Sequence, residues 1–197
     1  MVSPQSMRSD QRNLLQSVVS AARQCFARYG VHRTRMEDVA AAAGLARSRL
    51  YKLVTSKDEL IELALMERSR EYSEQMRAVA ERQQGDIAGA LVEVFIYGIA
   101  MARSDEEFSY LAEAIRRTRL QFLLTGTGSP MHGMVAYAFE PLLTRARVEK
   151  RLRPNLAVED IVHWFALLLS VLTPSEDVDE AVQRRLVERL LVPAVLA

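Results

Sequence analysis

The sequence has 197 residues, of which 49% are hydrophobic and 26% are charged, so the chain is long enough and apolar enough to bury a real core. Its single cysteine excludes an intramolecular disulfide. The formal net charge of +1 conceals an asymmetry, because residues 1–60 carry ten Lys and Arg side chains against five Asp and Glu. The basic first third is therefore suited to a polyanion, whereas the acidic remainder is not expected to contact phosphates.

The chain opens with a polar segment, residues 1–10, that we expect to be a flexible arm. It lacks the apolar stretch of a secretory signal. Apolar side chains then recur at helical spacing over residues 11–29, and Gly30 follows in the position where glycine commonly ends a helix.

The next stretch predicts two short helices, residues 36–43 and 46–53, joined by a tight turn at Gly44 and Leu45. Small and apolar side chains would pack the two helices closely together. The outward face of the second helix then carries four polar side chains, which suit the DNA major groove: Arg47, Ser48, Arg49 and Lys52. The other interpretation of this pattern is an ordinary helical hairpin with a solvated basic face.

A long helix is expected from Ser56 to about Gln84, because no glycine or proline interrupts this stretch. Ser56 and Glu59 have the spacing of a capping box. At about 1.5 Å per residue this helix would be roughly 40 Å long. It would therefore link a basic head to the rest of the chain as a lever.

The following helix, residues 87–103, is apolar on nearly every side, which predicts a buried core helix. It is shorter than the roughly 20 residues of a membrane span, so no membrane is expected. Glu93 is the one acidic residue of this segment. It points either to an edge of the helix or into a ligand pocket.

Further helices are predicted over the remaining sequence, beginning with a short one near residue 104. The others span residues 110–124, 130–151, 158–172 and 178–191.

The stretch from Thr34 to Leu60 resembles the DNA-binding signature of the TetR family of bacterial transcriptional repressors. The resemblance rests on Thr34, Asp38-Val39-Ala40, Gly44, Leu50-Tyr51 and Ser56-Lys57-Asp58-Glu59-Leu60. It implies phosphate contacts for Thr34, Tyr51 and Lys57, and base contacts for Arg47, Ser48 and Arg49. With Arg35 and Lys52 added, the predicted DNA-binding residues are Thr34, Arg35, Arg47, Ser48, Arg49, Tyr51, Lys52 and Lys57.

Two positions depart from the family pattern. The family commonly has Ser or Thr where this chain has Ala46, so a helix cap worth about 1 kcal/mol is missing. It also commonly has an aromatic residue or His followed by Phe where this chain has Leu53 and Val54. We therefore expect different packing behind the recognition helix.

The apolar width of the helix at 158–172 exceeds what one neighbour can cover. Together with the helix at 130–151 it predicts a two-fold interface, a four-helix bundle between two copies. The family resemblance implies the same arrangement. The expected interface residues are Val135, Phe139, Leu142, Ile161, Trp164, Phe165 and Leu168.

An apolar pocket in the same part of the chain is expected to hold a hydrophobic or aromatic small molecule, anchored by a few polar groups. By position, its candidate residues are Met66, Phe95, Tyr97, Ile99, Met101, Phe108, Phe122, His132 and Met134.

No catalytic or cofactor signature is recognisable. The three histidines form no catalytic group, and Asp160 with His163 is the one metal-like spacing, without the second motif that a di-iron site needs. We therefore predict no catalytic residue, no metal and no cofactor.

The sequence thus predicts an all-α protein: a three-helix helix-turn-helix head (residues 11–55) joined by a long helix to a larger ligand-binding and dimerisation body (residues 56–197). The predicted function is a cytoplasmic, homodimeric repressor that binds a palindromic operator in double-stranded DNA and is released by a small hydrophobic effector. Two alternatives stay open. One is an all-α carrier or enzyme with a vestigial head, and the other is an architectural DNA-binding protein.

Overall fold

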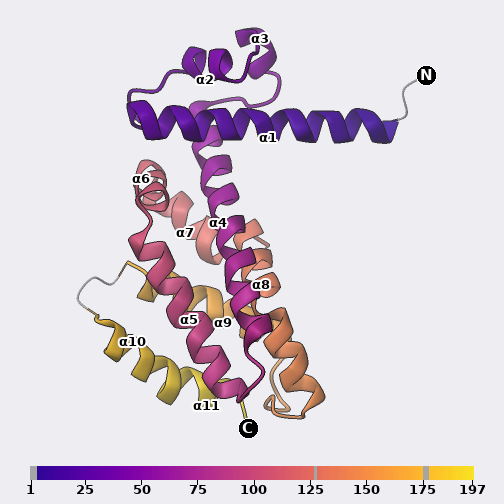
Figure 1. Cartoon of the computed structure of the whole chain (residues 1–197), viewed down its shortest axis with the longest axis vertical. Coiled ribbons are helices and arrows are strands. Elements are labelled where there is room, and N and C mark those ends of the chain that lie inside the picture. Colours follow the sequence, from indigo (N-terminus) through magenta and orange to yellow (C-terminus); the bar gives the residue numbers. More distant parts are fainter. Residues whose placement is uncertain (1–3, 127, 175–177) are drawn as a thin grey trace. The chain divides into compact units, whose positions relative to one another are not determined.

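The computed structural model describes residues 4–126, 128–174 and 178–197, and within these ranges the chain is built from helices (Figure 1). A single β-bridge between Leu152 and Leu196 is the exception. The helices are α1 (Pro4–Tyr29), α2 (Met36–Ala42), α3 (Arg47–Leu50), α4 (Lys57–Arg82), α5 (Ile87–Ser104), α6 (Glu106–Ala114), α7 (Arg117–Thr125), α8 (Pro130–Val148), α9 (Val158–Leu172), α10 (Glu180–Leu186), the π-helix η1 (Val187–Leu191) and α11 (Val192–Val195).

The chain divides into two compact units. Unit 1 runs to Arg68 and includes Tyr110–Arg116, and unit 2 comprises Ser69–Ser109 and Arg117–Ala197. Helix α4 is continuous and contributes to both units (Figure 1). The predicted all-α architecture, with an N-terminal helix-turn-helix and a larger helical body, is confirmed.

Helix α1 begins at Pro4, seven residues before the start that we expected. Proline is well tolerated in the first turn of a helix, where its missing N–H has no intrahelical partner to lose. The structure therefore places helix over residues 4–10 of the expected arm, and residues 1–3 lie outside the described residues. The flexibility of that segment stays a prediction.

The start of α4 differs in detail from a simple capping box. The Ser56 hydroxyl accepts the Glu59 N–H at 3.1 Å, as expected, but the Glu59 carboxylate accepts from the Thr55 hydroxyl at 2.6 Å and the Thr55 N–H at 2.7 Å. These two hydrogen bonds from Thr55 lower the pKa of Glu59, because they favour its charged form.

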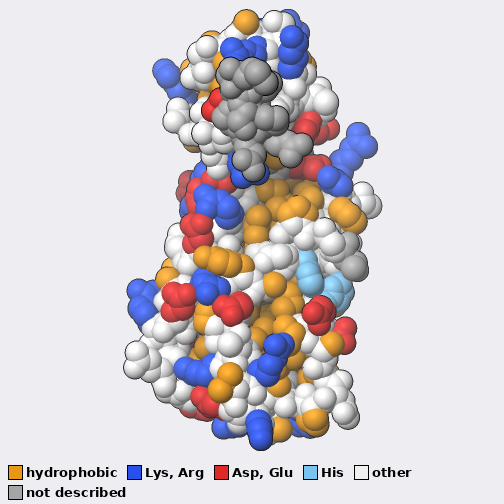
Figure 2. Space-filling view, turned by 90° about the vertical axis from the view of Figure 1, so that its right-hand side faces the viewer, with side chains coloured by type: hydrophobic (Ala, Val, Ile, Leu, Met, Phe, Trp, Pro, Cys, Tyr) orange, Lys and Arg blue, Asp and Glu red, His pale blue; other side chains and the backbone are white. Residues whose placement is uncertain are grey.

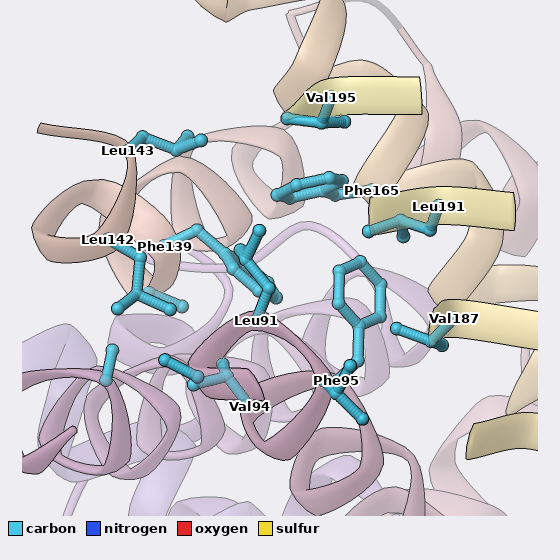
Figure 3. Close-up of a cluster of buried hydrophobic side chains, with 14 of the residues drawn as sticks. Leu91, Val94, Phe95, Phe139, Leu142, Leu143, Phe165, Val187, Leu191 and Val195 are labelled. Atoms are coloured by element: carbon cyan, nitrogen blue, oxygen red, sulfur yellow. The ribbon is translucent and has the colours of Figure 1, made fainter. Parts of the chain in front are cut away.

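The core of unit 2 is built around three aromatic rings from three helices. The ring centroids of Phe95, Phe139 and Phe165 are 4.8–4.9 Å apart, and all three side chains have an exposed fraction of 0%. Figure 3 shows them within a cluster of apolar side chains that also includes Leu91 and Leu191. Helices α5, α8 and α9 are therefore held together by direct aromatic contact.

Helix α5 is the predicted core helix. By length and composition it could cross a membrane, but 56% of its 18-residue window is buried inside the protein. Glu93 lies at an exposed edge of α5, where its carboxylate pairs with the Arg184 guanidinium at 2.5 Å. The edge position is therefore the correct one of the two alternatives for Glu93.

Several predicted helix boundaries change. The helix expected at 110–124 is divided between α6 and α7, and α8 ends at Val148, followed by Lys150 with a φ of 55°. The helix expected at 178–191 changes from α10 to the π-helix η1 at Val187. Here the Val192 N–H donates to the carbonyl of Val187, five residues earlier, and Pro193, the next residue, has no N–H for the usual bond to the carbonyl four residues earlier.

Truncation of the central ring tests this core. Phe95→Ala removes a fully buried ring, so we expect the free energy of unfolding to fall by about 3–5 kcal/mol in urea denaturation. Leu190→Ala is the matched control, because Leu190 is 65% exposed and its truncation should change stability by less than about 0.5 kcal/mol. Equal effects of the two substitutions would contradict the position given to Phe95.

Candidate nucleic-acid interface

A glycine turn joins α2 to α3. Gly44 has a φ of 66°, a left-handed conformation that costs a side chain with a Cβ atom strain energy. The Leu45 N–H then donates to the Ala40 carbonyl at 2.8 Å, which closes the end of α2. The predicted tight turn at Gly44 is confirmed.

Small apolar side chains fill the space between α2 and α3. Val39, Ala40 and Leu50 are at most 3% exposed, and Ala43 and Leu45 are half-buried. Because alanine adds little bulk, the two helices can approach closely. Their inner faces are thereby fixed, and the other side of α3 is left open to solvent.

The outer face of α3 carries the side chains that the sequence placed there. Arg47, Ser48, Arg49 and Lys52 are exposed, and Tyr51 is 41% exposed. Arg35, which precedes α2, is exposed as well. Six of the eight predicted DNA-binding residues therefore present their side chains to solvent in unit 1.

Helix α3 is short and has no side-chain cap at its N-terminus. Ala46 stands at its N-cap position without a side-chain hydrogen bond, as the sequence predicts. Hydrogen-bonded turns extend the segment beyond Leu50, since the Tyr51 N–H donates to Arg47 and the Val54 N–H donates to Leu50, at 3.1 and 3.0 Å. Val54 has an exposed fraction of 0%, so it packs inward behind this segment.

The other two predicted DNA-binding residues are engaged inside unit 1. Thr34 is 2% exposed, and its hydroxyl lies within hydrogen-bond distance of the carbonyls of Gly30 and Cys25, at 2.9 and 3.1 Å. The Lys57 ammonium donates to the His32 carbonyl at 3.0 Å. In this geometry both side chains fasten the loop between α1 and α2, and their phosphate contacts stay predictions that the geometry does not favour.

Sequence reasoning missed two features of this surface. The Arg47 guanidinium pairs with the Glu37 carboxylate at 2.8 Å, a contact between helices that no short-range spacing signals. In addition, Arg28, Tyr29, Arg33 and Asp38 line a hollow in which the Arg28 guanidinium lies 5.2 Å from the centre of the Tyr29 ring. The high proportion of arginine in this part of the sequence was the one feature from which this hollow could have been predicted.

The predicted effector residues differ in their burial. Phe95 and Ile99 have exposed fractions of 0% and belong to the core of unit 2. Tyr97 is at the surface, where its hydroxyl donates to the Gln75 side chain at 3.1 Å, and Phe122 is 49% exposed. The half-buried members of the set are Met66, Met101, Phe108, His132 and Met134. The expected list therefore mixes core, surface and intermediate side chains.

The expected interface residues also differ in their burial. Phe139, Leu142, Ile161 and Phe165 are at most 2% exposed, because they pack in the core of their own chain. Their burial corrects the expected set: four of its seven members have no free surface to offer a partner. Trp164 is 45% exposed, and Val135 and Leu168 are half-buried.

Large apolar side chains are nevertheless exposed on α8 and α9. Besides Trp164, they include Val171, 61% exposed, and Tyr137, 48% exposed. His132 of α8 and His163 of α9 lie together, with ring centroids 5.8 Å apart. Figure 2 shows histidine side chains beside hydrophobic ones on one face of this part of the protein. Across the described ranges, no three His, Cys, Asp or Glu side chains converge where they could hold a metal ion.

A short basic helix, braced by a second helix across a glycine turn, gives unit 1 the helix-turn-helix arrangement that is typical of DNA-binding domains. The family described as bacterial regulatory proteins, TetR family, matches residues 18–64. Residues 18–64 thus match the model of the TetR family, and the chain has the fold of solved structures described as TetR-family transcriptional regulators. No curated protein sequence matches the chain significantly.

Three solved structures illustrate the likeness. A TetR-family transcriptional regulator from Pectobacterium atrosepticum has a TM-score of 0.69 at 16% identity, over 96% of this chain and 97% of that one. SmeT, the repressor of the Stenotrophomonas maltophilia multidrug efflux pump SmeDEF, has a TM-score of 0.57 at 22% identity, over 93% and 90%. AlkX, a TetR-family repressor from a Dietzia species implicated in biodegradation of n-alkanes, has a TM-score of 0.63 at 20% identity, over 91% and 94%. At these identities the likeness concerns the fold.

The inward position of Thr34 can be tested by removing its hydroxyl while keeping its shape. For Thr34→Val we expect the free energy of unfolding to fall by about 1–2 kcal/mol, because the hydrogen bond that the buried hydroxyl donates to a backbone carbonyl is lost. DNA affinity, measured where the variant is fully folded, should stay within a factor of about 2 of the original value. Thr34→Ser keeps the hydroxyl and serves as the control. Unchanged stability with weakened DNA binding would instead make Thr34 a phosphate contact.

Proposed function

We propose that the chain is a ligand-responsive transcriptional repressor that binds a palindromic operator as a homodimer and is released by a small hydrophobic effector. In this proposal residues 11–55 form the DNA-binding domain, and residues 56–197 form the effector-binding and dimerisation domain. The protein acts in the cytoplasm as a regulator and not as an enzyme. The observation that carries the proposal is the exposed basic face of α3 behind a glycine turn.

DNA recognition in this proposal divides between base reading and phosphate contact. Arg47 and Arg49 read base edges in the major groove, where arginine bonds guanine O6 and N7. Ser48 lies between them and contacts a base or the backbone. Tyr51, Lys52 and Arg35 contact phosphates, which fixes the orientation of α3 but carries no sequence information.

Dimerisation in this proposal uses the surface of α8 and α9 centred on Trp164. A tryptophan that is nearly half exposed within an apolar surface is typical of a side chain that anchors a protein interface. In this proposal the two recognition helices of the dimer bind successive half-sites of a palindrome, which lie about 34–36 Å apart or a multiple of that distance.

Effector control in this proposal passes through α4, which extends through both units. The second half of α4 is attached to α8 by Arg77. Its guanidinium pairs with Glu140 at 3.0 Å, donates to the Tyr137 carbonyl at 3.0 Å and lies 4.6 Å from the centre of the Tyr137 ring. These contacts support the proposal that a change near α8 is passed to α4. Coupling of about 1–3 kcal/mol is typical of such control.

The base-reading role is tested on duplex DNA that the purified protein selects from a random pool. Arg47→Ala should lose about 1–3 kcal/mol of discrimination at one base position, because a bidentate contact disappears. Lys52→Ala should weaken binding to all sequences alike and flatten the salt dependence by about one unit. An equal loss on every sequence for both variants would favour an architectural DNA-binding protein. Failure to select any DNA would favour the carrier or enzyme.

The interface is tested by placing a charge at its proposed centre. Trp164→Glu should raise the dissociation constant of the dimer by about 100-fold in analytical ultracentrifugation, because a charge would be buried against apolar surface. Leu190→Glu is the control, since Leu190 is exposed on η1. Trp164 is also the only tryptophan. Its emission in the unmodified protein should therefore move to shorter wavelength as dimers form. A dimer that tolerates Trp164→Glu would contradict this interface.

A further inference from the structure

The side chain of Arg47 is held from two sides within unit 1. Its Nη1 atom lies 2.8 Å from Oε1 of Glu37, and its guanidinium carbon lies 5.5 Å from the centre of the Tyr51 ring. Glu37 belongs to the first turn of α2, and Arg47 is the first residue of α3. The contact therefore crosses the glycine turn and connects the bracing helix to the recognition helix.

This ion pair is not placed to stabilise the fold. The Arg47 side chain is 63% exposed and the Glu37 side chain is 49% exposed. Water screens an exposed pair strongly, so such pairs contribute little to stability. An acidic side chain beside the arginine also repels DNA phosphates. Neither the stability of the fold nor the overall affinity for DNA therefore explains a carboxylate at this position.

The neighbouring acidic residue, Asp38, already has a hydrogen-bond partner. Asp38 accepts a hydrogen bond from the Arg35 N–H at 2.8 Å and so caps the start of α2. Glu37 is thus the acidic residue of α2 that reaches across to α3. Arg47 keeps most of its hydrogen-bond donors in this ion pair, because a guanidinium has five N–H groups and the contact with Glu37 occupies Nη1. Arg47 can therefore bind Glu37 and a guanine edge together.

We propose that Glu37 is a positioning residue for DNA recognition, which rests on the function proposed above. Its carboxylate fixes one edge of the Arg47 guanidinium, and the Tyr51 ring limits the movement of the plane. The free edge then faces a base in one orientation. A long, mobile arginine would otherwise reach phosphates and several bases with similar ease. Glu37 thereby lowers affinity for DNA in general and raises discrimination at the base that Arg47 reads.

The test separates the charge of Glu37 from its hydrogen bond. Glu37→Gln removes the charge and keeps an oxygen that accepts from Arg47, whereas Glu37→Ala removes both. Asp58→Asn is the matched control, because Asp58 is an exposed acid in the first turn of α4. Fluorescence anisotropy would measure the affinity of the full-length variants for the selected duplex, for its single-base variants and for random duplex, over a range of salt concentrations.

We expect all three variants to bind random duplex several-fold more tightly, because each removes one negative charge from the DNA-facing unit. Only Glu37→Ala should lose discrimination, by about tenfold, at the position that Arg47→Ala identifies. Glu37→Gln should keep discrimination within about threefold. In the double variant with Arg47→Ala, Glu37→Ala should cause no further loss.

Three results would overturn the inference. Unchanged discrimination in Glu37→Ala would make the ion pair irrelevant to base reading. Equal loss in Glu37→Gln and Glu37→Ala would make charge, and not positioning, the cause. A loss at a different base position that persists in the double variant would show that Glu37 contacts a base itself. If Arg47→Ala alone changed no base preference, the function proposed above would fail first, so the two failures are distinguishable.

Discussion

The sharp turn at Gly44 is the constraint on which the DNA-facing surface depends. With a φ of 66° and the Leu45 N–H bonded to the Ala40 carbonyl, the chain reverses direction within a few residues. Val39 and Ala40 can then pack beside Leu50, and this packing decides which side of α3 is left in solvent. A residue with a Cβ atom at position 44 would strain the backbone. The directions of the outward side chains from Arg47 to Lys52 therefore depend on this turn.

The polar contacts of unit 1 serve that same surface in two ways. Thr34 and Lys57 fasten the loop that precedes α2, so they hold the bracing helix in place. Glu37 acts on the other side of the turn, where it fixes the direction of one arginine. The exposed arginines are thus supported by side chains that do not themselves need to touch DNA. Pre-organisation of this kind favours one bound geometry over many loose ones.

Local pattern was sufficient to predict much of the fold. Glycines at positions 30 and 44 marked the ends of α1 and α2, and the apolar periodicity of residues 158–172 gave the bounds of α9. These features could be predicted because they depend on neighbours within a few residues. The burial of four of the seven expected interface residues could not be predicted, for the opposite reason. Phe139, Phe165 and Trp164 are all large and apolar, and the sequence does not say that two of them pack on Phe95 while the third faces solvent.

The candidate site shows the same limit. The pattern correctly placed Arg47, Ser48, Arg49 and Lys52 outward, because their positions on α3 follow from the turn and the apolar side. The pattern did not reveal the inward hydroxyl of Thr34, which depends on where α1 ends, or the pairing of Arg47 with Glu37. Such contacts join residues ten or so positions apart, and their geometry is fixed only when the helices have packed.

The central claim is that the exposed arginines of α3 read guanine in the major groove, at two half-sites of one operator. Dimethyl sulfate methylates guanine N7, the major-groove atom that arginine contacts. Footprinting of the selected duplex with this reagent is therefore the most direct measurement. The account predicts two symmetric clusters of protected guanines, about one helical turn apart or a multiple of it, with one guanine in each cluster exposed again in Arg47→Ala. Bound DNA whose guanine N7 atoms all stay reactive would contradict the claim.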